Sequence, residues 1–108
     1  MPGGKYILEG KEPKLVKNLF EWAQWMQTGD RIVAKTKRKD VEVSTVFLGL
    51  DPRFFTGGKP LLFETMVFGG KFNLEQERYH TRNEAEEGHQ RMVAKVFKQT
   101  SRPRGWKE

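Results

Sequence analysis

The two histidines, His80 and His89, are the side chains best suited to acid–base or metal chemistry near neutral pH. His89 falls at the centre of an apolar helical face. There it could be a general base or a ligand in a pocket, or a core residue with one satisfied hydrogen bond. His80 stands next to the expected start of that helix, near the surface. The strand-to-helix junction between them gives no spacing that aligns both on one metal ion. We interpret His89 as a core residue and expect no metal or cofactor.

The sequence contains no motif for a known type of reaction. Residues 57–59 (Gly-Gly-Lys) have the composition of a phosphate loop, but no helix follows them. Because the chain has no cysteine, thiolate nucleophiles, disulfides and cysteine-bound zinc are excluded. An enzyme with a site around Asp51, Glu64 and His89 is the least supported hypothesis, and we predict that the chain is not an enzyme.

Positive charge is concentrated in two segments of the chain. The net charge is +6 at pH 7. Residues 31–40 hold five bases against Asp40, which gives +4, and residues 91–108 hold six bases against Glu108, which gives +5. Such clusters favour binding to nucleic acid or to an acidic protein surface, or they serve only solubility.

The candidate binding residues lie in a hairpin tip, a loop and a tail. The basic hairpin could contact phosphates or an acidic surface. The loop at 51–60, rich in Gly and Pro, holds two adjacent phenylalanines that either fold into the core, which we favour, or face a partner. The tail carries a tryptophan that could stack on a base. The candidates are Lys35, Lys37, Arg38, Lys39, Arg53, Phe54, Phe55, Arg102, Arg104 and Trp106.

A first helix is predicted to begin after Asn18. This asparagine is a suitable N-cap, and Glu21 completes a capping-box pattern. Gly29 is expected to end the helix in a left-handed conformation. Trp25 lies on the flank of the apolar face, where it rims the core or anchors a partner. The apolar face consists of Leu19, Phe20, Trp22, Ala23 and Met26.

Strands are predicted on both sides of this helix. Lys5–Leu8 is expected to be a short strand, and Lys14–Val16 either extends it or pairs with it across a turn at Gly10–Pro13. Arg31–Lys37 and Val41–Leu50 should form an antiparallel hairpin with a basic turn at 38–40. The remaining predicted strands are Leu61–Phe68 and a short edge strand, Gln76–His80.

A second helix is predicted to begin at Thr81, which forms a capping box with Glu84. Acidic residues lie in its first turns and basic residues in its later ones, the order that the helix dipole favours. Gly88 borders the apolar face and would let the helix approach the sheet closely. The apolar face consists of Ala85, His89, Met92, Val93 and Val96.

These elements predict an α+β fold with a mainly antiparallel sheet of three to five strands and two helices packed on it. We expect one domain over residues 1–100 and a mobile basic tail over residues 101–108. The sequence has neither the apolar stretch of a signal peptide nor a run of about 18 apolar residues, so we expect no membrane contact and a cytoplasmic location.

Three stretches of this sequence together are similar to a group of small uncharacterised proteins of tailed phages and prophages. They are residues 43–51 (VSTVFLGLD), residues 60–70 (PLLFETMVFGG), and the pattern RYHT, EAE, GH and MV between residues 78 and 93. The group usually has a histidine after the aspartate, where this chain has Pro52. The resemblance implies a phage origin and a location in the host cytoplasm, and it supplies no catalytic residues.

The sequence therefore favours a small non-catalytic phage accessory protein that binds a host or phage macromolecule. A protein partner is preferred, such as a host defence or replication factor that the chain would inhibit. The alternative is a nucleic-acid-binding protein that uses the basic hairpin and the C-terminal tail.

Overall fold

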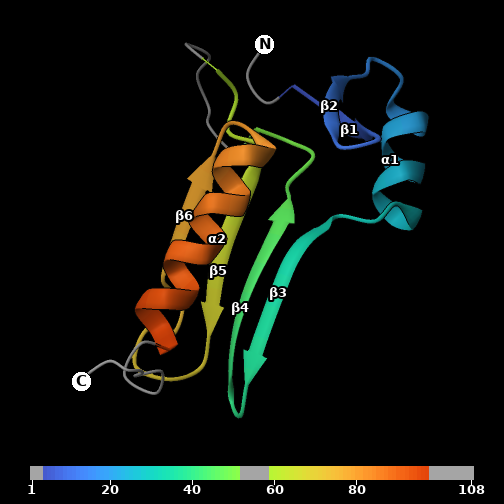
Figure 1. The fold of residues 1–108 in the computed structure, drawn as a ribbon. Coiled ribbons are helices and arrows are strands. Elements are labelled where there is room, and N and C mark those ends of the chain that lie inside the picture. The colour runs from blue at the N-terminus through green and yellow to red at the C-terminus, as the bar shows by residue number, and fades with distance from the viewer. Residues whose placement is uncertain (1–3, 52–58, 98–108) are drawn as a thin grey trace.

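The computed structural model describes residues 4–51 and 59–97. Within these ranges the chain forms a two-stranded sheet, a helix, a four-stranded sheet and a second helix (Figure 1). The predicted α+β class with an antiparallel sheet of three to five strands is confirmed. No helix in the described part of the chain has the length and apolarity needed to cross a membrane.

The N-terminal sheet pairs β1 (Tyr6–Glu9) with β2 (Glu12–Leu15) in antiparallel register, which is the pairing alternative of the sequence analysis, and β2 begins two residues before the predicted Lys14. Gly10 adopts a positive φ of 64° in the turn between them, a conformation that glycine accepts without steric cost. The Tyr6 backbone N–H donates to the Gly49 carbonyl at 2.8 Å. This bond attaches the small sheet to the chain just beyond the end of β4.

Helix α1 (Leu19–Thr28) begins where the sequence predicted, with the Asn18 side chain accepting bonds from two backbone N–H groups. Two expectations for it were wrong. Gly29 has a φ of −76°, so it does not end the helix in a left-handed conformation. Leu19 and Phe20 are exposed, Phe20 to 84%. Among the described residues, α1 lies beside β1 and the end of β4, and these leave Leu19 and Phe20 uncovered.

The larger sheet has the antiparallel order β3–β4–β5–β6, with β3 and β6 at its edges. Its strands are β3 (Ile32–Arg38), β4 (Val41–Phe47), β5 (Phe63–Phe68) and β6 (Gln76–Tyr79). The turn between β3 and β4 is Lys39-Asp40, one residue shorter than predicted. Strand β4 ends three residues before the predicted Leu50, because Gly49 turns the chain with a φ of 76°. The hairpin tip lies at the end of the sheet opposite α1 (Figure 1).

Helix α2 (Arg82–Phe97) covers one face of this sheet. The Thr81 hydroxyl accepts a bond from the Glu84 N–H at 3.1 Å, and the Glu84 carboxylate accepts from the Thr81 N–H at 3.4 Å, so the predicted capping box is present. Gly88 faces Tyr79, and a β-carbon on it would lie 2.3 Å from the phenol ring. The close approach predicted from this glycine is confirmed.

The core lies between α2 and the sheet in two clusters. One contains Phe47, Phe63 and Tyr79, and Trp25 of α1 packs edge-on against Phe47 with ring centroids 5.6 Å apart. Trp25 therefore rims the core, the first of its two predicted roles. The other cluster lies nearer the hairpin tip and contains Val43, Val67, Met92 and Phe97. The opposite face of the sheet, here called the outer face, carries Lys35, Ser44, Met66 and Gln76 as one cross-strand row.

Candidate functional site

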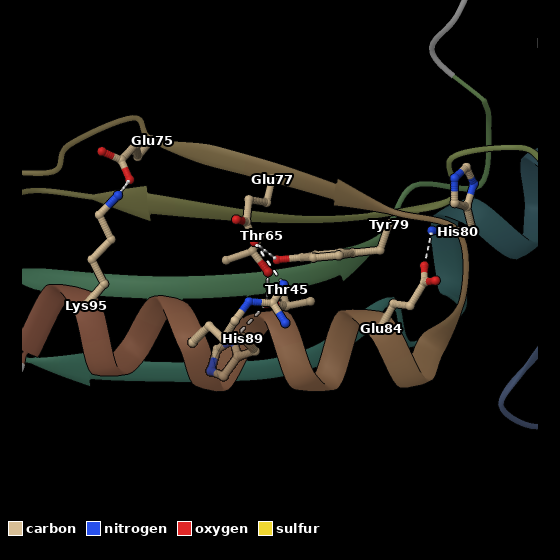
Figure 2. A network of polar contacts seen from close by, with 10 residues as sticks. Thr45, Thr65, Glu75, Glu77, Tyr79, His80, Glu84, His89 and Lys95 are labelled. Atoms are coloured by element: carbon tan, nitrogen blue, oxygen red, sulfur yellow. Dashed lines mark hydrogen bonds and ion pairs between the residues drawn. The ribbon is translucent and has the colours of Figure 1, made fainter.

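His89 is buried between α2 and the sheet, with 1% of its surface exposed. Its Nε2 lies 2.9 Å from the Thr36 hydroxyl on β3, and its Nδ1 lies 2.7 Å from the Thr45 hydroxyl on β4. Both ring nitrogens are therefore hydrogen-bonded, one more bond than the sequence analysis expected. Figure 2 shows the ring inserted between these strands and the helix.

A chain of hydrogen bonds continues from this histidine to the surface (Figure 2). The hydroxyls of Thr45 and Thr65 lie 2.5 Å apart, and the Thr65 hydroxyl bonds the Tyr79 phenol. The phenol donates to the Glu77 carboxylate at 2.9 Å. Glu77 in turn pairs with Arg91 of α2 at 3.5 Å. The polar chain, as we call this series, connects all four strands of the larger sheet with α2.

The carboxylate at the end of the polar chain fixes the direction of every bond in it. An ionised carboxylate only accepts, so Tyr79 donates to Glu77 and its oxygen accepts from Thr65. Thr65 then accepts from Thr45. With its hydrogen used in this way, Thr45 must accept from the histidine. Nδ1 of His89 therefore carries a proton, and in the neutral ring Nε2 accepts from the Thr36 hydroxyl.

The titration of the buried groups follows from this environment. Burial lowers the pKa of His89, because the imidazolium form would lose its hydration. Burial also raises the pKa of Tyr79 to about 12, and the nearby Glu77 carboxylate adds to the increase. Both groups stay neutral at pH 7, so the interior of this face holds a satisfied polar network without a buried charge.

The three residues of the enzyme hypothesis do not form a common site. Glu64 lies on the outer face, where it pairs with Arg78 at 3.0 Å, whereas His89 lies on the face under α2. Asp51 lies beyond the end of β4. Residues 4–51 and 59–97 contain no group of three potential metal ligands. Two pockets, about 350 and 310 Å³ in volume, are lined by β1, the β1–β2 turn, the start of β2 and the two helices rather than by His89.

The predicted basic tip is present as the β3–β4 hairpin, and its bases point in different directions. Lys35 and Lys37 alternate with Thr36, which faces His89, so these two lysines lie on the outer face. Arg38 lies on the α2 side, with its guanidinium 4.7 Å from the Phe97 ring centroid. Lys39 occupies the turn with a φ of 54°. We call these four residues the basic hairpin.

The bases of this hairpin have no carboxylate partners among the ion pairs of the described residues. Ion pairs join Arg78 to Glu64, Arg91 to Glu77, Lys95 to Glu75, Arg82 to Glu86 and Lys14 to Glu9. None of these pairs uses a residue of the basic hairpin. Its charge is therefore available to a partner.

The other candidate binding residues are not placed by the structure. Arg53, Phe54, Phe55, Arg102, Arg104 and Trp106 lie outside the described residues, as does the predicted tail at 101–108. Their proposed roles remain predictions.

Sequence reasoning missed the partners of His89. The signal was present, since Thr36, Thr45 and Thr65 occupy inward-facing positions of three strands where apolar residues would be expected. Threonine has a high β-propensity, which explained these residues without any hydrogen-bonding role. The combination of inward-facing threonines with a histidine on the covering helix would have indicated the polar chain.

No protein family model, no curated protein and no solved structure matches this chain.

Proposed function

We propose that this chain is a non-catalytic binding protein that holds a host or phage macromolecule, most favourably a protein, through its basic hairpin. The observation that carries this proposal is the set of bases at 35, 37, 38 and 39 without carboxylate partners in the described residues. Unpaired bases on one projecting element attract an acidic surface and speed its association.

The backbone at Lys39 gives independent support. Its φ of 54° is in the left-handed region, where a residue with a side chain costs roughly 1 kcal/mol relative to glycine. A lysine at this position of a two-residue turn is a poor choice for stability alone. Local strain of this kind often accompanies function, and here it adds a positive charge at the extreme end of the hairpin.

The similarity to phage proteins bears on the partner and the location. It supports a host factor, for instance one of defence or replication that the chain would inhibit, or another phage protein. The host cytoplasm is the corresponding location. Both statements are drawn by analogy.

Nucleic acid is the second candidate partner. The outer face carries Lys37 in the same cross-strand row as Phe68, whose ring is 44% exposed. A base next to an aromatic ring is the arrangement that binds a phosphate and stacks a nucleobase. However, Glu42 lies between these two residues in the row and would repel a phosphate backbone.

The test uses the full chain as bait in a lysate of phage-infected bacteria, with and without nuclease treatment. Two variants of the bait are compared with the unmodified chain. The hairpin variant combines Lys35→Glu, Lys37→Glu and Lys39→Glu. The control variant, which has the same net charge, combines Lys11→Glu, Lys17→Glu and Lys71→Glu. We expect a stoichiometric protein that survives nuclease, is lost with the hairpin variant and is kept by the control. Equal retention by both variants would contradict the proposal. Loss on nuclease treatment would identify nucleic acid as the partner.

A further inference from the structure

We propose that the free edge of β3 binds an extended acidic peptide segment, which joins the sheet as an added strand next to β3. This inference rests on the proposed binding function and specifies the chemistry and geometry of the partner. Strand β3 has seven residues and no neighbour on its outer side among the described residues. An edge strand of this length offers a row of backbone groups to an incoming chain.

The hydrogen bonds of β4 show which residues of β3 offer these groups. The Leu48 N–H donates to the Leu62 carbonyl, and the Phe47 N–H donates to the Arg31 carbonyl. Even-numbered residues of β4 thus bond toward β5 and odd-numbered ones toward β3. The partners of Val41, Val43 and Thr45 are Arg38, Thr36 and Ala34. The intervening residues of β3, Lys35 and Lys37, therefore direct their backbone N–H and C=O groups to the free edge.

The side chains of the same two lysines supply the positive charge that would attract an acidic peptide. Their side chains lie on the outer face, beside the positions that alternate side chains of an added strand would occupy. Strand β3 contains no acidic residue. Asp40 and Glu42, the acids of the hairpin, lie in the turn and on β4, away from the free edge. An acidic chain along β3 would therefore meet basic side chains and no acidic one on that strand.

The opposite edge of the sheet is unsuited to this role. Strand β6 has only four residues. Its Arg78 is paired with Glu64, and its Glu77 is bonded to Tyr79 and Arg91. The short length and the satisfied charges leave little for an added strand to bind.

Two other occupants of the β3 edge fit less well. A second copy paired through its own β3 would place Lys35 and Lys37 against lysines of the same kind, and like charges on neighbouring strands are destabilising. A phosphodiester backbone offers hydrogen-bond acceptors but no donors, so the carbonyls of Lys35 and Lys37 would stay unpaired. A peptide strand supplies both donors and acceptors.

The experiment follows backbone amide exchange of the full chain by NMR, with a capped peptide of about ten residues, alternating glutamate and valine, as the probe. The control peptide has lysine in place of every glutamate. Single DNA strands and duplexes of about 20 nucleotides are tested as well, and all probes are used at about 50 mM salt. We expect the acidic peptide to slow amide exchange at Lys35 and Lys37 at least about tenfold, with little change in β6. Unchanged exchange at saturating peptide, or the same protection with the lysine peptide, would overturn the inference.

Two variants separate the backbone contribution from the charge. Lys37→Pro removes one outward-facing N–H, which an edge strand tolerates, and Lys37→Gln removes the same charge but keeps the N–H. We expect Lys37→Pro to weaken peptide binding about tenfold more than Lys37→Gln. Equal weakening would show that charge alone acts. If DNA binds without protecting any amide at the β3 edge, the added strand is refuted and the proposed binding function still stands. If the lysate partner binds the hairpin variant as well as the unmodified chain, the proposed binding function itself is refuted.

Discussion

Nδ1 of His89 and the Thr45 hydroxyl oxygen lie 2.7 Å apart, and this bond joins the middle of α2 to the central strand β4. The polar chain that ends at Glu77 requires the histidine to be the donor. The tautomer of a buried ring is thus set by a carboxylate on β6, through three hydroxyl groups.

We expect His89 to be neutral at pH 7 with its proton on Nδ1. Nitrogen-15 NMR of the imidazole distinguishes a protonated ring nitrogen from an unprotonated one, so it measures the tautomer directly. The Glu77→Gln variant is the informative comparison, because its amide can also donate and no longer fixes the direction of the chain. A ring protonated on Nε2 in the unmodified protein would contradict the assignment.

The stability of the fold should decrease in mild acid because of His89. Burial lowers its pKa from the ordinary value of 6.5, so below that pH the unfolded chain binds more protons than the folded one. The contribution is fully present above about pH 6.5 and falls by up to about 1.4 kcal/mol per pH unit until the pKa of the folded state is reached. Urea unfolding between pH 5 and 7 measures it.

The matched controls for this pH dependence are His89→Phe and His80→Gln. The first should flatten the pH profile whatever its effect on total stability, and the second should retain the slope. A slope that survives in His89→Phe would assign the dependence to another group.

Replacing Gly88 by alanine should destabilise the protein although alanine is the better helix former. A β-carbon would lie 2.3 Å from ring atoms of Tyr79, and such overpacking costs about 1–3 kcal/mol. The gain in helix propensity is about 1 kcal/mol. Denaturant unfolding of Gly88→Ala should therefore show a net loss. Tyr79→Leu in the same chain should recover part of it, and Gln90→Ala, at an exposed position of α2, should be nearly neutral.

Lys39→Gly should increase stability by about 1 kcal/mol, since glycine adopts the positive φ of this turn without strain. Lys39→Ala removes the same charge without relieving the backbone and should leave stability almost unchanged. Thermal unfolding compares the two. If both variants behave alike, strain at this turn is not the cause, and the argument that the lysine serves binding loses that support.

Much of the fold could be predicted from local patterns. The capping box of Thr81 and Glu84, the alternation along β3 and β4, and the glycine at position 88 each determine structure within a few residues of themselves, and all three were confirmed. The predicted hairpin tip was displaced by one residue, because Arg38 continues the strand.

The errors arose where the outcome depended on distant parts of the chain. The periodicity of α1 identified an apolar face but not the element that packs against it. Leu19 and Phe20 are exposed because the small β1–β2 sheet does not reach them. The hydrogen bonds of His89 come from residues 44 and 53 positions away. No local pattern contains that information.

The attachment of the N-terminal elements has a consequence for how the molecule opens. Helix α1 has no buried residue. It and the β1–β2 pair join the sheet through bonds from Tyr6 and Trp22 to the Gly49 carbonyl, through the Trp25–Phe47 contact, and through packing of Tyr6 and Leu8 against the Phe47 cluster. We therefore expect residues 4–29 to unfold locally at a lower free energy than α2 and the four strands that the polar chain joins.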